Sequence, residues 1–258
     1  MSSLQISNLS ITVIVGSRIG PDCLAVALEN SPHSKFVIGV TPRADHEEVK
    51  QVLANFPDHH VELGAAGDVL KALSAGVGAS DWLLNLWGEL IIDQAALNNC
   101  RSSLNIHPSM LPWARGSDPI VWTIANGWPA GATLHEMTAE VDAGPIWVQR
   151  EVAYDFATSG GELYEMVLQE CFSIFEEEWP RILSGEVTAR PQVPGETPAR
   201  RSQLHERRDT SLDEPSSVEL GRFLRLIQAY DFGAHFSARV RDKGVLYRIS
   251  VKAVPDPD

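Results

Sequence analysis

The sequence has little positive charge for its length. Its 258 residues include 21 Lys and Arg against 34 Asp and Glu, which gives a formal net charge of −13 and an isoelectric point near 5.0. Because affinity for a phosphate backbone comes from Lys and Arg, this balance argues against nucleic-acid binding. We therefore expect no nucleic-acid partner.

Cysteine is also scarce, and long apolar runs are absent. Cys23, Cys100 and Cys171 lie far apart, and none has the spacing of a metal knuckle, so we expect three reduced thiols and no metal. No apolar run approaches the roughly 20 residues that span a bilayer, and the first ten residues lack the basic start and apolar core of a signal peptide. These features predict a soluble, cytoplasmic protein without a membrane partner.

The sequence does contain a regular alternation of predicted strands and helices. Short β-branched or apolar runs predict strands at residues 11–15, 35–40, 60–63, 81–86 and 102–106, with helical patterns between them. This alternation predicts an α/β fold with a doubly wound, mostly parallel sheet covered by helices on both faces. In such sheets ligands bind beyond the carboxyl ends of the strands.

The remaining sequence predicts a second sheet segment, a long helix and a small appendage. Strands at 131–137 and 145–152 flank a loop, and a helix follows at 161–183. Residues 186–215 show no periodic pattern, whereas 217–230 has helical spacing. It precedes a predicted hairpin with strands at 236–240 and 246–251. We therefore predict a catalytic domain at 1–192, a linker at 193–216 and a small C-terminal helix and β-hairpin subdomain at 217–258.

Three polar residues form the candidate catalytic group. Asn105 and His107 are two residues apart where a predicted strand meets a proline-containing loop, so their side chains share one face. Asp142 follows about 35 residues later, in a loop rich in small residues. An amide that donates to a developing oxyanion, an imidazole that moves a proton and a carboxylate that orients it suit acyl transfer to an amine.

The motifs around these residues resemble those of the formyltransferase family that uses N10-formyltetrahydrofolate, including methionyl-tRNA formyltransferase. The matching segments, in order, are residues 105–112, 115–116, 119–120, 131–135, 142–146 and Gln149, with weaker agreement at 87–88 and 161–192. The resemblance implies a Rossmann-like formyltransferase fold and N10-formyltetrahydrofolate as formyl donor. It also implies that Asn105, His107 and Asp142 are catalytic.

The resemblance further implies which residues bind the two substrates. Donor binding is expected from the following residues: Trp87, Gly88, Leu90, Ile91, Ser109, Met110, Leu111 and Val141. Acceptor binding is expected from Arg115 and Gly116, although a structural ion pair is an equal interpretation of Arg115. His135 is expected to be structural or to support the catalytic group.

The C-terminal segment indicates which branch of the family the chain resembles most. The tRNA enzyme carries a C-terminal barrel of near a hundred residues, whereas only about forty remain here after the last predicted helix begins. Residues 225–232 and 247–249 resemble the tail of sugar N-formyltransferases, which act on nucleotide-linked amino sugars. The expected acceptor is therefore a primary amine on such a sugar, and the expected assembly is a homodimer. Another small amine (peptide, siderophore or natural product), formyltetrahydrofolate hydrolysis and non-catalytic folate binding remain alternatives.

Overall fold

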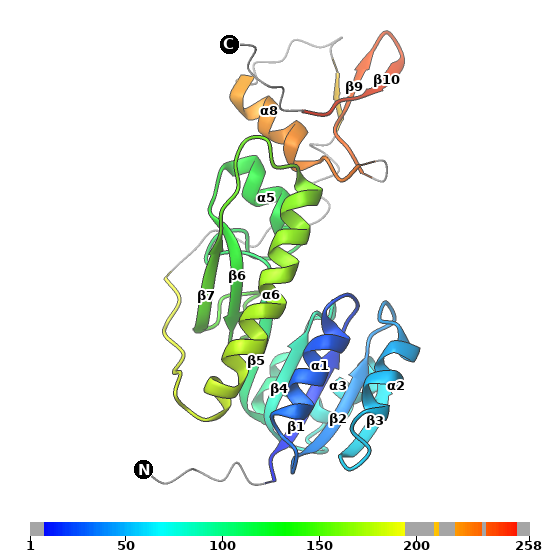
Figure 1. Cartoon of the computed structure of the whole chain (residues 1–258), viewed down its shortest axis with the longest axis vertical. Helices are drawn as coiled ribbons and strands as arrows, with labels where there is room; N and C mark the ends of the chain where they lie inside the picture. Colours follow the sequence, from blue (N-terminus) through cyan, green and yellow to red (C-terminus); the bar gives the residue numbers. More distant parts are fainter. Residues whose placement is uncertain (1–7, 194–208, 212–219, 234–235, 252–258) are drawn as a thin grey trace. The chain divides into compact units, whose positions relative to one another are not determined.

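The computed structural model describes residues 8–193, 209–211, 220–233 and 236–251 (Figure 1). The chain divides into two compact units. Unit 1 comprises Met1–His107, Thr133–Gln149 and Cys171–Val193, and unit 2 comprises Pro108–Ala132, Arg150–Glu170 and Pro194–Asp258. The predicted domain boundaries at residues 192 and 216 remain a prediction.

A seven-stranded sheet with the order β3-β2-β1-β4-β5-β6-β7 forms the centre of the fold. Its strands are β1 (Ser10–Val15), β2 (Lys35–Val40), β3 (His60–Ala65), β4 (Ser80–Leu86), β5 (Cys100–His107), β6 (Ala130–His135) and β7 (Ile146–Val152). The pairings from β3 to β5 are parallel, and β5 pairs with β6 in antiparallel orientation. The predicted doubly wound, mostly parallel α/β sheet is confirmed.

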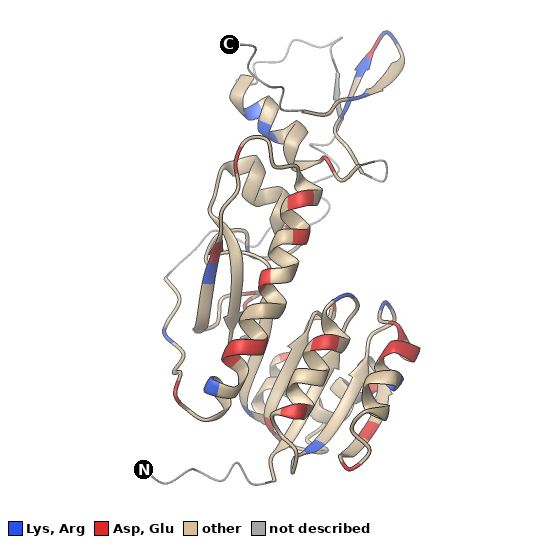
Figure 2. Cartoon of the chain, in the orientation of Figure 1, with Lys and Arg blue, Asp and Glu red and all other residues tan. Residues whose placement is uncertain are grey.

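Helices α1 (Gly20–Glu29), α2 (His46–Ala54), α3 (Ala66–Ser74) and α4 (Gln94–Asn98) connect the parallel strands, as the alternating pattern predicts. Helix α5 (Pro119–Asn126) lies between β5 and β6 in the chain, and α6 (Gly160–Leu183) follows β7. A capping box begins α6, because Ser159 Oγ accepts from Glu162 N at 3.2 Å and Ser159 N donates to the Glu162 carboxylate at 2.8 Å. The hydrogen bonds that Ser159 N and Ser159 Oγ donate to the carboxylate lower the pKa of Glu162. Acidic side chains recur along α6 and on α1 and α2, in keeping with the net charge (Figure 2).

The core of unit 1 lies between the sheet and its helices. The inner strand β1 is buried from Ile11 to Val15, as expected where helices cover both faces. An aromatic cluster fixes the end of α6: Trp179 is fully buried, stacks on Phe175 and meets Trp82 edge-on at 5.1 Å. Cys23 and Cys171 are buried free thiols, and burial raises the pKa of Cys23 well above its usual value.

Unit 2 contains the predicted C-terminal helix and hairpin. Helix α8 (Leu220–Ala229) contacts α5, and Gln228 donates to the carbonyls of Asp155 and Thr158. A three-stranded sheet has the order β10-β9-β8, formed by β8 (Asp209–Ser211), β9 (Arg239–Asp242) and β10 (Val245–Arg248).

The hairpin and linker predictions differ from the structure in detail. The predicted strands at 236–240 and 246–251 are displaced, because the two-residue turn at Lys243 and Gly244, both with positive φ, sets the register of β9 and β10. Strand β8 lies within the predicted linker at 193–216, and most of that segment lies outside the described residues.

Candidate active site

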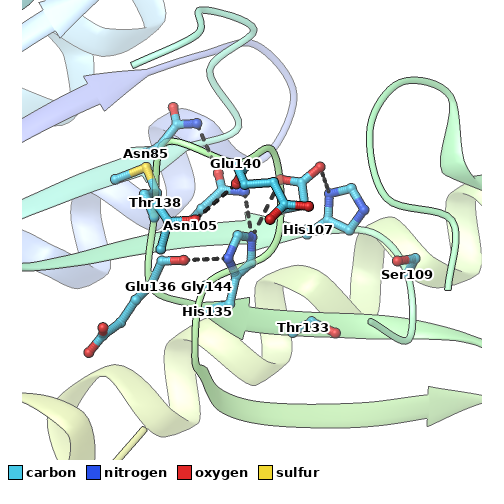
Figure 3. A network of polar contacts seen from close by, with 12 residues as sticks. Asn85, Asn105, His107, Ser109, Thr133, His135, Glu136, Thr138, Glu140 and Gly144 are labelled. Atoms are coloured by element: carbon cyan, nitrogen blue, oxygen red, sulfur yellow. Dashed lines mark hydrogen bonds and ion pairs between the residues drawn. The ribbon is translucent and has the colours of Figure 1, made fainter. Parts of the chain in front are cut away.

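The pairing of β5 with β6 assembles the candidate site. Asn105 lies opposite His135, and His107 lies opposite Thr133, in the antiparallel register. Directly opposite residues of an antiparallel pair project to the same face, and alternate residues of one strand do so as well. Asn105, His107 and His135 therefore share one face at the end of β5 (Figure 3).

Asp142 places its carboxylate between the two histidines. Its Oδ2 lies 3.6 Å from His107 Nδ1, and its Oδ1 lies 3.6 Å from His135 Nε2. The side chain of Asp142 is 14% exposed, that of His107 6% and that of His135 1%. The carboxylate and His107 are close enough for an ion pair when His107 is protonated, and burial strengthens that attraction. The structure thus brings the three sequence-predicted catalytic residues together, and their catalytic roles remain a prediction.

A chain of side-chain hydrogen bonds holds Asn105. Asn85 Nδ2 donates to Asn105 Oδ1 at 2.8 Å, and Asn105 Nδ2 lies 3.0 Å from His135 Nε2. His135 Nδ1 lies 2.6 Å from the carbonyl oxygen of Glu136. His135 therefore contacts two of the predicted catalytic residues, which goes beyond the purely structural alternative.

Contacts of the main chain fix the loop that carries Asp142. Asp142 has φ of 50°, a left-handed conformation that Asp tolerates better than most residues. Gln192 Nε2 donates to the carbonyl oxygens of Asp142 and Gly144, both at 3.1 Å. A side chain at Gly144 would lie 1.9 Å from the carbonyl oxygen of Glu136, so only glycine fits there. Burial raises the pKa of the neighbouring Glu136 carboxyl.

The predicted donor-binding residues of unit 1 differ in exposure. Ile91 is 86% exposed and Val141 is also exposed, whereas Leu90 packs on a core cluster that includes Leu73 and Leu83. Trp87 has φ of 63°, which turns the chain sharply after β4. The carbonyl oxygen of Gly88 accepts from Asn85 Nδ2 at 3.2 Å, so this turn is tied to the chain of amides.

The predicted binding residues of unit 2 lie in a loop closed by its own hydrogen bonds. Ser109 is buried and donates its hydroxyl proton to the carbonyl of Trp113 at 2.8 Å, and Trp113 N donates to the carbonyl of Met110 at 3.0 Å. Leu111 and Arg115 are buried, and Gly116 follows with φ of 88°. The hydroxyl of Ser109 thus stabilises the loop conformation, and the binding roles of these residues remain predictions.

The described residues contain neither a metal-ligand cluster nor a membrane-spanning helix. No group of three or more His, Cys, Asp or Glu side chains within that part of the chain is placed to hold a metal ion. Over the same residues, no helix has the length and apolar character needed to cross a membrane.

Sequence reasoning overlooked Asn85 and Gln192 as members of the site. Asn85 lies on β4 and belongs to no motif, and only the register of β4 against β5 shows that it faces Asn105. Gln192 ends a weakly matching segment, and only the return of the chain after α6, where Arg190 bridges to Ile146, brings it to the Asp142 loop.

Comparison with known proteins places the chain in a family. Residues 69–177 match the model described as formyl transferase. The dTDP-4-amino-4,6-dideoxyglucose formyltransferase of Mycobacterium tuberculosis is 31% identical over 166 residues, which are 63% of this chain and 68% of the relative. The chain belongs to the formyl transferase family. It is an enzyme of the N-formyltransferase type.

Solved formyltransferase structures share its fold. A sugar N-formyltransferase from Shewanella sp. aligns with a TM-score of 0.73 and 18% identity over 96% of this chain and 99% of that chain. The N-formyltransferase of Helicobacter canadensis, solved with folinic acid and dTDP-3-aminofucose, aligns with a TM-score of 0.65 and 17% identity over 87% and 81%. At these identities the likeness establishes the formyltransferase fold.

Proposed function

We propose that this formyltransferase transfers the formyl group of N10-formyltetrahydrofolate to a primary amine of a nucleotide-linked amino sugar. The observation that carries the proposal is the position of the Asp142 carboxylate between His107 and His135, beside the amide of Asn105. The M. tuberculosis relative is named for a dTDP-linked amino sugar, and the H. canadensis neighbour was solved with another, together with a folate.

In this proposal each residue of the group has one task. The folate supplies the formyl group as a substrate. Asn105 Nδ2 carries two hydrogens, one of which faces His135, so the other donates to the formyl oxygen as negative charge grows there. His107 turns Nδ1 to Asp142, and in this proposal Nε2 takes a proton from the attacking amine. The amine then forms a bond to the formyl carbon while the bond from that carbon to N10 breaks and N10 gains a proton.

Asp142 supports this chemistry through charge. Its carboxylate lies 3.6 Å from His107 Nδ1 and faces the positive charge that the ring gains as the amine proton moves to Nε2. The same carboxylate holds the ring orientation, as in other acid–base groups with an Asp behind a His. No step in this scheme requires a metal.

The substrate-binding residues extend this proposal. In unit 1 we assign donor binding to Trp87, Gly88, Leu90, Ile91 and Val141. In unit 2 the resemblance implies donor binding by Ser109, Met110 and Leu111 and acceptor binding by Arg115 and Gly116. The exposed side chains of Ile91 and Val141 supply apolar surface that suits a pterin or its benzoyl group. Leu90 contributes through its backbone, since its side chain packs on the core cluster.

We also propose that the enzyme is a cytoplasmic homodimer. Three free cysteines suit a reducing compartment. Strand β10 is an edge of its sheet and exposes the apolar side chains of Val245, Leu246 and Tyr247. An exposed apolar edge strand is commonly covered by a partner, and a second copy of the chain is the partner proposed here.

The rate of formyl-folate conversion as a function of added amine tests the function. We expect conversion that depends on a dTDP- or UDP-linked amino sugar and is slow with a free simple amine. Conversion at full rate with no amine would identify a hydrolase instead. The control variant Asp93→Asn, outside the site, should behave as wild type, whereas His107→Asn should be inactive.

A further inference from the structure

Asn85 is a buried polar residue to which the motifs assign no role. It lies near the carboxyl end of β4, opposite Asn105 in the parallel register of β4 and β5, and is 7% exposed. Its Nδ2 uses both hydrogens, one on the carbonyl of Gly88 and one on Asn105 Oδ1. Its own Oδ1 has no hydrogen-bond partner among the described residues, a costly arrangement that calls for a reason.

Two backbone carbonyls fix the direction of the hydrogen-bond chain. Gly88 O can only accept, so the side of the Asn85 amide that faces it must be the NH2 group. Glu136 O can only accept, so His135 Nδ1 carries the proton and the neutral ring presents an unprotonated Nε2. Asn105 lies between these ends, with its oxygen toward Asn85 and its NH2 group toward His135.

The reverse orientation is unfavourable at the Asn85 end and would change the protonation of His135. If Asn105 turned its oxygen toward His135, Nε2 would need a proton in addition to the one on Nδ1, and the cationic ring would face the Asp142 carboxylate 3.6 Å away. The NH2 group of Asn105 would then face the NH2 group of Asn85. Asn85 could turn in response only by placing its own oxygen against Gly88 O. A side chain at residue 88 would lie 2.3 Å from Asn85 Oδ1, so glycine is the residue that fits beside this amide.

We propose that Asn85 is a positioning residue that sets the amide orientation of Asn105, so that Asn105 presents N–H rather than oxygen to the formyl group. The expected effect on kcat rests on the formyl transfer proposed above. The orientation itself can be measured without any activity, because it determines the protonation of His135.

The variant Asn85→Asp replaces the NH2 group that faces Asn105 by a carboxylate oxygen, with almost no change in side-chain shape. A carboxylate only accepts, so it draws the NH2 group of Asn105 toward itself and turns the Asn105 oxygen toward His135. We expect kcat to fall about 100-fold, the loss that follows removal of one oxyanion donor, with folate affinity within threefold of wild type. As the pH falls through the pKa of the new carboxyl, the protonated acid can donate to Asn105 again. The ratio of variant to wild-type kcat should therefore rise.

Nitrogen-15 spectra of labelled histidine give the matched structural readout, with His135→Gln used to assign the signals. Wild type should show His135 protonated at Nδ1 alone at mildly alkaline pH, and Asn85→Asp should show both nitrogens protonated. Thr12→Val is the control, because it removes another buried side-chain hydrogen bond of this sheet, to Ser80, and should change neither kcat nor the His135 signals.

Several results decide between the possibilities. A folded Asn85→Asp protein with wild-type kcat, or with unchanged His135 protonation, would overturn the inference. If Asn85→Asp does not fold, Asn85→Ala is the second variant. It should lower kcat about five- to tenfold, the contribution of one neutral hydrogen bond, while His135 keeps its proton on Nδ1. Wild-type kcat in Asn85→Ala would also overturn the inference. If wild type transfers no formyl group, the proposed function fails, and the histidine spectra still test Asn85.

Discussion

Replacing Asp142 by Asn is expected to lower kcat roughly 100-fold while the protein stays folded. The loop should keep its shape, because Gln192 binds the main-chain carbonyls of Asp142 and Gly144 rather than the carboxylate. Asn also tolerates the left-handed backbone at this position. The change therefore removes the negative charge that lies between His107 and His135.

The magnitude follows from the distance between the two groups. For unit charges 3.6 Å apart, the Oδ2–Nδ1 separation, Coulomb's law with an effective dielectric constant of about 20 gives about 4–5 kcal/mol. The Asp142 side chain is 14% exposed, so solvent screens the attraction between the two charges, and we take about half of the Coulomb energy. About 2–3 kcal/mol corresponds to roughly a 30- to 150-fold loss, which agrees with the usual contribution of general acid–base groups.

The assay is the initial rate of formamide formation at saturating donor and acceptor. Near-ultraviolet circular dichroism and Tm confirm that the variant is folded. Asp93→Asn is the matched control, because Asp93 caps α4 through Ala96 N and Asn caps helices equally well. More than a third of wild-type kcat in a folded Asp142→Asn protein would refute the role assigned to this carboxylate.

Three further predictions concern the loop, the helix cap and the edge strand. Gln192→Ala should lower kcat about tenfold with little change in donor KM, because it frees the Asp142 loop by removing a side chain that bonds two carbonyls; wild-type kcat would contradict this. Ser159→Ala should cost about 1 kcal/mol in urea denaturation at neutral pH. Hydrogen bonds lower the pKa of Glu162 in the folded state, so its stabilisation is fully present above the ordinary carboxyl pKa and is lost as the pH falls through the lower, folded-state pKa. The difference between the two proteins should therefore shrink in acid, and a constant difference would count against the cap. Leu246→Lys should convert a dimer in sedimentation velocity to a monomer, and a wild-type monomer at micromolar concentration would reject the edge-strand interface.

The sequence was sufficient for the features that depend on local pattern. The apolar run at 11–15 predicts an inner strand because both of its faces are covered, and the structure buries it. The two-residue spacing of Asn105 and His107 predicts a shared face, which β5 confirms.

The features that depend on register and chain return could not be predicted in the same way. The partnership of Asn105 with His135 depends on how β6 aligns against β5, and that of Asn85 with Asn105 on how β5 aligns against β4. A shift of one residue in either pairing would turn the partner to the opposite face. Gln192 reaches the Asp142 loop only because the chain returns along β7 after a 24-residue helix. Spacing along the sequence contains no information about these alignments.

The most direct test of the account is the fate of the formyl carbon. The purified protein is incubated with N10-formyltetrahydrofolate labelled with carbon-13 in the formyl group and with dTDP-4-amino-4,6-dideoxyglucose, and the products are followed by NMR and mass spectrometry. The account predicts that the label appears in a formamide on the amino sugar, and that His107→Asn and Asp142→Asn proteins form it at least tenfold more slowly. Label released only as formate, or a formamide formed equally fast by the variants, would contradict it.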